Sequence, residues 1–172
     1  MNQNELSKYL KQFDISHTVT DQQCFTLYQY ASKCKDGVIV ELGTGTGKST
    51  LSLALGAVPT VYTVDPFIVP GSQESFNNNM VKAHFTGKVV SIHSTSIVAS
   101  KTFGLPIGLM FIDADHSYPM VKNDYERWSS KMIQNSTMIF HDYNEVHPGL
   151  CKYIDEIEIP KHIINQMVFI RF

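Results

Sequence analysis

The sequence predicts an α/β fold with a mostly parallel sheet that helices cover on both faces. Near-continuous apolar runs of four to six residues alternate with segments of helical periodicity. Such runs are typical of parallel strands that are buried on both sides. The last two apolar runs are separated only by Asn165 and Gln166, which leaves no room for a crossover helix. They therefore predict an antiparallel hairpin at one edge of the sheet.

Each element follows from this alternation. Two helices are expected before the sheet, at residues 4–13 and 21–33, the second with Asp21 as its N-cap. The strands are expected at residues 37–42, 61–64, 89–92, 107–112, 137–140, 162–164 and 167–170. The other helices are expected at residues 48–55, 74–85, 96–101, 118–130 and 146–157. We expect one domain over residues 1–172, with residues 1–34 forming a short helical cap.

Composition and charge narrow the class of protein. The formal net charge is -2, without a run of Lys or Arg, so nucleic acid is not expected as a partner. The three cysteines include no C-x-x-C pair, which argues against a disulfide framework or a structural zinc site and fits a reducing compartment. No apolar run approaches the roughly 18 residues of a membrane span, and the start lacks the apolar core of a signal peptide. We expect a cytoplasmic protein without a membrane partner.

The glycine-rich segment at residues 41–50, Glu-Leu-Gly-Thr-Gly-Thr-Gly-Lys-Ser-Thr, follows the first strand of the sheet. A P-loop needs a glycine five positions before the glycine that precedes Lys-Ser, and Leu42 holds that position. Gly43 lies one residue, or about 3.3–3.6 Å of chain, too late. A P-loop ATP-binding enzyme is therefore only a remote alternative. A dinucleotide fingerprint would place its third glycine at Lys48. The helix that begins near Gly47 offers free N–H groups to a carboxylate or a phosphate.

Polar or acidic residues follow five of the predicted strands, and they are found at residues 41–43, 65–66, 93–94, 113–116 and 141–142. In open α/β sheets, ligands bind outside the carboxyl ends of the strands. Asp65 lies about 20 residues after the first glycine of the loop, where a carboxylate can accept hydrogen bonds from ribose hydroxyls. The alternative is that Asp65 is a turn residue before Pro66.

Several motifs follow one another along the chain: Val-Glu-Leu-Gly-Thr-Gly-Thr-Gly, Val-Asp-Pro, Ile-Asp-Ala-Asp-His-Ser-Tyr, then Asp124 and Trp128, and finally His-Asp-Tyr. With them the chain resembles the class I S-adenosylmethionine-dependent methyltransferases, in the branch of macrocin O-methyltransferase and the cephalosporin-hydroxylase-like proteins. The resemblance runs from about residue 21 to about residue 150. It implies a Rossmann-like three-layer sandwich with a seven-stranded sheet ordered 3-2-1-4-5-7-6, in which strand 7 is antiparallel. The family's glycine pair before strand 5 reads Gln134-Asn135 here, and Asn can replace Gly in a left-handed turn.

The resemblance also implies how the cofactor S-adenosylmethionine is bound. Glu41, Gly43 and Gly45 would line its methionine end, and Asp65 would bind its ribose. Ser94 and Ser96 would lie near the adenine. Asp113 would lie beside the sulfonium.

Asp113 and Asp142 end adjacent strands in that order, so we expect their carboxylates to converge. With His141 or Asn144 they would hold a divalent cation, Mg²⁺ in the first place and Mn²⁺ or Ca²⁺ as alternatives. The alternative is that Asp142 only caps the following turn and that Asp113 accepts hydrogen bonds from loop amides. His116 and His141 are the candidate general bases, although His116 fits a surface loop equally well. No catalytic role is assigned to the other histidines, which are His17, His84, His93, His147 and His162.

The resemblance implies a methyltransferase with Asp113, His116 and His141 at its catalytic centre. Its acceptor would be a small-molecule hydroxyl on a sugar, a polyketide-like compound or a phenol. The alternative is a non-catalytic or regulatory nucleotide-binding module on the same fold. Because the N-terminal cap is short, we expect the acceptor pocket either to stay open or to be completed by another subunit of a homo-oligomer. Trp128 is expected to pack between helix and sheet, whereas Tyr118 and Tyr143 could either line the pocket or pack.

Overall fold

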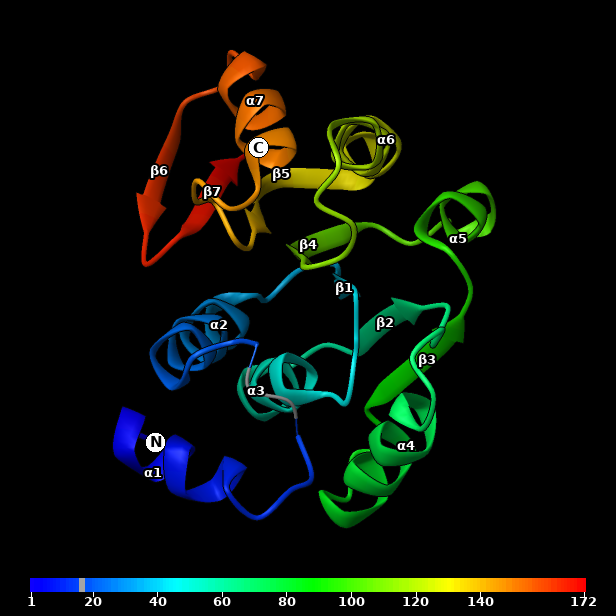
Figure 1. Cartoon of the computed structure of the whole chain (residues 1–172). Coiled ribbons are helices and arrows are strands. Elements are labelled where there is room, and N and C mark those ends of the chain that lie inside the picture. Colours follow the sequence, from blue (N-terminus) through cyan, green and yellow to red (C-terminus); the bar gives the residue numbers. More distant parts are fainter. Residues whose placement is uncertain (16–17) are drawn as a thin grey trace.

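The structure is a computed structural model that describes residues 1–15 and 18–172. Its seven strands form one sheet in the order β3-β2-β1-β4-β5-β7-β6, in which β7 pairs antiparallel with both β5 and β6 (Figure 1). The strands are β1 (Val38–Leu42), β2 (Val61–Asp65), β3 (Val89–His93), β4 (Ile107–Ile112), β5 (Met132–Phe140), β6 (Lys161–Ile164) and β7 (Met167–Arg171). The sheet order and the single antiparallel strand confirm the predicted Rossmann-like fold.

The helices cover the sheet on both faces (Figure 1). They are α1 (Gln3–Leu10), α2 (Asp21–Lys33), α3 (Lys48–Gly56), α4 (Ser72–Lys82), α5 (Ser96–Thr102), α6 (Tyr118–Trp128) and α7 (Pro148–Glu156), with a 3-10 turn at Ser129–Lys131. Alternate residues of each strand point to opposite faces. As a result Ile39 and Phe111 join the core under α1 to α4, whereas Val40 and Met110 join the core under α5 to α7.

The observed boundaries differ from the predicted ones mainly at helix ends. Thr20, not Asp21, caps α2: its hydroxyl accepts a hydrogen bond from the Gln23 N–H, and the Gln23 side chain accepts one from the Thr20 N–H. This reciprocal capping box satisfies two otherwise unpaired N–H groups, which makes Asp21 the first helical residue. Helix α7 begins at Pro148 because proline fits the first turn of a helix, where no N–H partner is needed.

The backbone is left-handed at two places in the C-terminal half of the sheet. Asn135 has φ +64 within β5, in agreement with the expectation that it replaces glycine there. Strand β5 begins at Met132, five residues before the predicted start, and its pairing with β4 is irregular near Ile107. Asn165 and Gln166 have φ +51 and +61, the backbone of a two-residue hairpin turn.

Among the described helices, none has the combined length and apolar character that a membrane crossing requires.

Candidate active site

The glycine loop, residues 43–47, follows β1 and has a left-handed backbone at each of its three glycines. Gly43, Gly45 and Gly47 have φ +86, +52 and +94, a region that side chains with a Cβ rarely adopt. A Cβ on Gly43 would lie 1.9 Å from the Asp113 carbonyl oxygen, so only glycine lets this loop approach the end of β4. The loop therefore joins the glycine motif to the acidic motif of β4 through a direct backbone contact.

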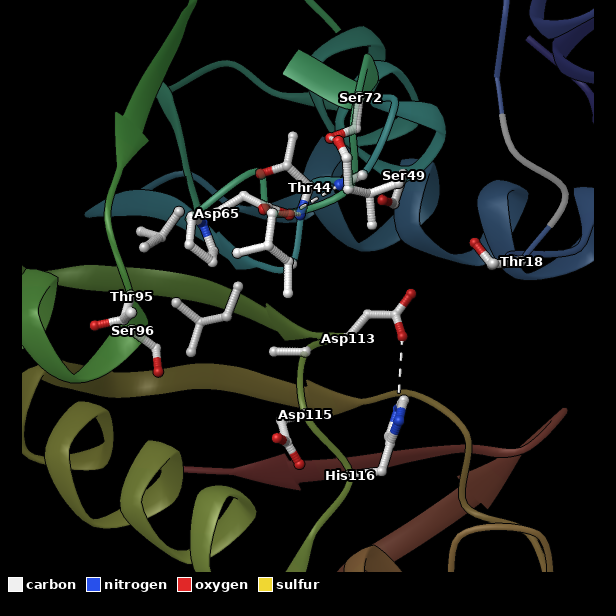
Figure 2. A pocket seen from close by; sticks show the side chains of 18 of the residues that line it. Thr18, Thr44, Ser49, Asp65, Ser72, Thr95, Ser96, Asp113, Asp115 and His116 are labelled. Atoms are coloured by element: carbon white, nitrogen blue, oxygen red, sulfur yellow. Dashed lines mark hydrogen bonds and ion pairs between the residues drawn. The ribbon is translucent and has the colours of Figure 1, made fainter. Parts of the chain in front are cut away.

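Asp65, at the end of β2, supports this loop from below. Its Oδ2 accepts hydrogen bonds from the N–H groups of Thr44 and Gly45 at 2.7 and 3.0 Å. Its Oδ1 accepts one from the Phe67 N–H at 2.6 Å, which is the turn role considered for this residue. The Asp65 carboxylate also lines the cavity in front of the loop (Figure 2). It is thus both a turn residue and an acceptor group at the cavity wall.

Glu41 lies beneath the glycine loop and not on the cavity wall. Its side chain is fully buried, and its Oε2 accepts hydrogen bonds from the hydroxyls of Thr50 and Thr63 at 2.5 and 2.7 Å. Burial raises the pKa of Glu41 to about 7, although hydrogen bonds from Ser49, Thr50 and Thr63 oppose that shift. Its Oε1 is buried without a hydrogen-bond partner. A buried acceptor of this kind costs free energy unless a donor reaches it.

The cavity at the carboxyl ends of the strands measures about 760 Å³, within the roughly 300–1,000 Å³ range of small-molecule and cofactor sites. Thr18, Ser49 and Ser72 surround one part of it, while Thr95 and Ser96 lie at the opposite part (Figure 2). Gly43 and Gly45 line it, as does Asp113. The glycine loop and the acidic motif therefore face one shared cavity.

Lys48, the residue at the P-loop lysine position, is directed to the N-terminal cap. Its ammonium donates a hydrogen bond to the Val19 carbonyl at 2.6 Å and lies 3.0 Å from an Asp21 carboxylate oxygen. From α4, the Asn79 amide donates to the carbonyls of Asp14 and Thr46 at 2.7 and 2.9 Å. The N-terminal segment is therefore fastened to the glycine loop from two sides, which gives Lys48 a structural role in place of phosphate binding.

A second buried carboxyl group lines the end of the cavity near α5. The Ser96 hydroxyl donates to Asp124 Oδ1 at 2.5 Å, and both residues line the cavity. Burial raises the pKa of Asp124 to about 6, against the opposing hydrogen bond from Ser96. The Ser94 side chain does not contribute to the wall; its N–H donates to the Asp65 carbonyl at 3.2 Å. Of the two serines predicted near the adenine, the structure brings only Ser96 to the cavity.

The carboxyl ends of β4 and β5 bring together three of the predicted residues. The imidazole Nδ1 of His141 lies 3.2 Å from Asp113 Oδ1 and 3.2 Å from Asp142 Oδ1. His141 is only 1% exposed. The three ligand atoms lie within 4.8 Å of one another, which is close enough to hold one metal ion. The two carboxylates therefore converge as expected from adjacent strands.

Mutual contacts fix the charges of this group. Burial opposes ionisation of Asp113, but contacts with His116 and His141 lower its pKa to about 2. Burial likewise favours neutral His141, but hydrogen bonds with Asp113 and Asp142 and their charges raise its pKa to about 9. Near neutral pH the cluster thus contains an ionised carboxylate beside an imidazolium.

His116 faces the same carboxylates from the loop after β4. Its Nε2 lies 3.7 Å from Asp113 Oδ1, the contact drawn as a dashed line in Figure 2, and 3.6 Å from Asp142 Oδ2. His116 lines the cavity, whereas His141 does not. Of the two candidate bases, His116 is the one that a molecule in the cavity can contact.

The structure also places His147 in this cluster, although no role was predicted for it. Its Nε2 lies 3.8 Å from Asp142 Oδ2, and its ring centroid lies 4.1 Å from that of His116. A histidine followed by Pro-Gly, just after a strand-end His-Asp pair, is the signal that could have identified it. Asn144, considered as a metal ligand, instead accepts the Val146 N–H at 3.0 Å and contacts Gln166.

Three aromatic residues lie outside the cavity wall. Trp128 is fully buried against Phe103, which confirms its packing role. The hydroxyls of Tyr118 and Tyr143 donate to Glu156 and Asp155 of α7. Both tyrosines thus fasten α7 and do not line the cavity. His17, to which no role was assigned, lies outside the described residues.

Known proteins share both the motifs and the fold. A family profile described as "Methyltransferase domain" matches residues 40–143. An uncharacterised protein of Acanthamoeba polyphaga mimivirus is 26% identical over 140 residues, which cover 74% of this chain and 63% of that protein. The chain therefore spans about 63% of the length of this curated relative.

Two solved structures illustrate the likeness in fold. An O-methyltransferase from Bacillus cereus, in complex with S-adenosylhomocysteine, matches with a TM-score of 0.73 at 15% identity, covering 99% of this chain and 90% of that one. The O-methyltransferase TomG from Streptomyces achromogenes, involved in tomaymycin synthesis and in complex with S-adenosylmethionine, matches with a TM-score of 0.71 at 14% identity, covering 99% and 89%. At such identities the likeness establishes the fold.

Proposed function

Because the chain belongs to the methyltransferase-domain family that matches residues 40–143, and has the class I fold, we propose that it is an S-adenosylmethionine-dependent O-methyltransferase of a small-molecule hydroxyl. The single observation that carries this proposal is the shared cavity, where the glycine loop and Asp65 face Asp113 and His116. A cofactor site and an acid–base site on one wall are what methyl transfer to a hydroxyl requires.

The residues present fit the cofactor. Gly43 and Gly45 leave room for a ligand against the loop backbone, and Asp65 offers carboxylate oxygens for ribose hydroxyls. Glu41 of β1 accepts hydrogen bonds from Thr50 of α3 and Thr63 of β2, while its Oε1 has no partner. We therefore assign Glu41 a role in positioning these three elements. Ser96 and Asp124 supply polar atoms at the other end of the cavity. When bound, S-adenosylmethionine supplies the methyl group on its sulfonium.

We propose that Asp113, His141 and Asp142 hold a divalent cation. Two carboxylates and one imidazole suit Mg²⁺ or Mn²⁺ once the cation has displaced the proton from the His141 ring. A cation there would stabilise the acceptor oxygen as it loses its proton. His116 is then the proton acceptor, because its ring lines the cavity beside Asp113. The chain's own contribution is to orient the acceptor hydroxyl, which can supply on the order of 7–11 kcal/mol.

Part of the cavity wall is apolar. Ile68 and Val69, in the loop after Asp65, line the cavity and are 83% and 64% exposed. We propose a phenol, a polyketide-like compound or a sugar as the acceptor that carries the hydroxyl. That TomG is involved in tomaymycin synthesis supports a small-molecule acceptor here as well. We further propose that residues 1–172 form one domain and that the protein is cytoplasmic, since its three free cysteines suit a reducing compartment.

The proposal is tested first by calorimetry with S-adenosylhomocysteine. Wild-type protein should bind it, and Asp65→Ala should weaken binding by about 10–100-fold, because hydrogen bonds to a charged group contribute about 1.5–3 kcal/mol. Asp65→Asn keeps an oxygen for the Phe67 N–H and separates the turn role from ligand binding. Asp36→Ala, an exposed carboxyl before β1, is the matched control. Wild-type protein that binds no S-adenosylhomocysteine would remove the proposal.

Turnover then separates the enzyme from a regulatory module on the same fold. Protein is incubated with methyl-labelled S-adenosylmethionine and a metabolite extract, with and without Mg²⁺. Label transferred to a small molecule supports the enzyme. Tight cofactor binding without transfer to any acceptor, at any metal condition, would favour the module instead.

A further inference from the structure

We propose that His116, Asp142 and His147 form a second cation site, which selects Zn²⁺ and similar transition ions. It lies beside the oxygen-rich triad of Asp113, His141 and Asp142 and shares Asp142 with it. The ligand atoms of His116, Asp142 and His147 all lie within 4.8 Å of one another. None of the roles assigned above uses His147.

The two imidazoles point at the same carboxylate oxygen. His116 Nε2 and His147 Nε2 lie 3.6 and 3.8 Å from Asp142 Oδ2, beyond hydrogen-bond distance. His116 Nε2 is buried and has no hydrogen-bond partner. Two nitrogen lone pairs and a carboxylate oxygen thus surround one point without bonding to one another. An ion at that point would satisfy all three.

The backbone near His147 is built for this approach. A Cβ on Gly149 would lie 2.9 Å from the His116 carbonyl oxygen and 2.7 Å from the Tyr118 N–H, so the start of α7 packs directly on the His116 loop. The His147 N–H donates to the Asn144 carbonyl at 3.1 Å. These contacts hold two histidines together that are distant in sequence, and the site does not depend on a single loop.

The donor set indicates which ions would bind. Two imidazoles with one carboxylate are typical of Zn²⁺ and Fe²⁺ sites, whereas Mg²⁺ prefers oxygen ligands. Two ligands held about 2.1 Å from a tetrahedral ion lie roughly 3.4 Å apart, but adjacent ligands of an octahedral Mg²⁺ lie roughly 3.0 Å apart. The separations of 3.6 and 3.8 Å are closer to the tetrahedral value. His116 and Asp142 line the cavity, which leaves a fourth position for water or a ligand.

Asp142 can serve the two sites with different oxygens. Its Oδ1 lies 3.2 Å from His141 Nδ1, while its Oδ2 faces His116 and His147. The two sites are therefore distinguishable by mutation: His147 belongs only to the second. If the proposed function is correct, an ion held by His116 Nε2 also makes the His116 ring a weaker proton acceptor, so Zn²⁺ would inhibit methyl transfer.

The test is a titration of untagged, EDTA-treated and desalted full-length protein with Co²⁺, followed by its visible absorption. This absorption grows strongly when Co²⁺ becomes four-coordinate. Wild-type protein should show that absorption, Zn²⁺ should displace it, and excess Mg²⁺ should not. His147→Ala should weaken Co²⁺ binding at least tenfold, because even indirect partners of metal ligands change affinity by about 10–100-fold.

His162→Ala is the matched control, since this exposed histidine stacks on Phe169 away from the cluster and should leave Co²⁺ binding unchanged. His147→Gln, checked by thermal unfolding, guards against a folding defect. Equal Co²⁺ affinity of folded His147 variants and wild type, or displacement by Mg²⁺, would overturn the second site. S-adenosylhomocysteine calorimetry on the same samples tests the proposed function separately, because it requires neither ion nor His147.

Discussion

The ends of β1 and β4 lie side by side in the sheet. The first carries a buried carboxyl group and the second a half-buried one, and the two have different electrostatic surroundings. At the end of β1, Glu41 accepts hydrogen bonds from the hydroxyls of Thr50 and Thr63, and burial, with the nearby Asp113 charge, raises its pKa to about 7. One residue beyond β4, Asp113 is also desolvated, but contacts with His116 and His141 lower its pKa to about 2. Burial acts on both in the same direction, so the partners decide which carboxyl is charged.

This difference divides the site into two parts. Neutral donors around Glu41 suit a rigid support for the glycine loop, where a permanent charge would be costly. The imidazoles around Asp113 maintain a charge that can attract a cation or accept a hydrogen bond. The predictions below test whether partners, and not depth of burial, separate the two carboxyl groups.

The largest effect is expected from Asp113→Asn. This variant removes the charge of Asp113, which lies beside the proposed proton acceptor His116, while it preserves the shape of the side chain. We expect methyl transfer to fall by about 10²–10⁴-fold, the range for a lost acid–base contribution. Turnover with an acceptor from the labelling experiment measures it. Asp36→Asn is the control, and retained S-adenosylhomocysteine binding shows that the fold persists. Activity within about threefold of wild type would contradict a role for this charge.

Glu41→Gln should change the pH dependence of stability. Because the pKa of Glu41 is raised from 4.5 to about 7 in the folded state, the folded protein binds the proton more tightly than the unfolded chain. Wild-type stability should therefore fall as the pH rises from about 4.5 to about 7, by on the order of 1–3 kcal/mol. The variant should lack this decrease, as urea unfolding at several pH values would measure. Glu158→Gln, at an exposed site, should behave like wild type.

Asp113→Asn should also lower the pKa of His141 from about 9 toward the ordinary 6.5, by about one unit or more. In the wild type this raised pKa stabilises the fold below about pH 6.5. That contribution is lost as the pH rises through about 9. The imidazole resonances of metal-free protein report the titration by NMR. An unchanged pKa would mean that Asp142 alone keeps the ring charged.

The smallest effect is expected from Thr63→Val, which removes a hydroxyl that donates to Glu41 and also contacts the Thr44 hydroxyl, but keeps a strand-forming shape. Loss of these neutral contacts should cost about 1 kcal/mol of unfolding free energy. The cost should be larger at pH 8, where Glu41 is charged, than at pH 5. Urea unfolding at the two pH values gives an internal control. Equal costs would indicate that Glu41 does not ionise in the folded state.

The sequence predicted the fold class from its local patterns, whereas the order of the strands in the sheet was implied by the family resemblance. Apolar runs specify strands buried on both faces, and the two residues between the last runs allow only a hairpin. The boundaries of helices and strands depend on local contacts that the hydrophobic periodicity of the sequence does not show. The range predicted for α2 agrees with the structure, but the capping box makes Thr20 its N-cap in place of Asp21, and the left-handed Asn135 lies inside β5 and not before it.

The site was less predictable because side-chain direction decides it. Asp113, His141 and Asp142 meet because two adjacent parallel strands end at one level, which the sequence indicates. Glu41 and Ser94 lie in the same sequence motifs but are turned away from the cavity wall. His147 reaches the cluster where Gly149 closely approaches the His116 loop, a tertiary contact that hydrophobic periodicity does not predict.

The anchoring of Lys48 has a consequence for how much of the chain is needed. Its side chain is 7% exposed, and its ammonium contacts a carbonyl and a carboxylate that both precede the sheet. Shortening the gene so that translation starts after residue 21 would remove both partners of this buried cation, and an unpaired buried charge costs several kcal/mol. The first turn of α3 would then have to reorganise, and with it the glycine loop. The leading helices are thus a condition for assembling the ligand cradle, and a trimmed version should be recovered as insoluble material.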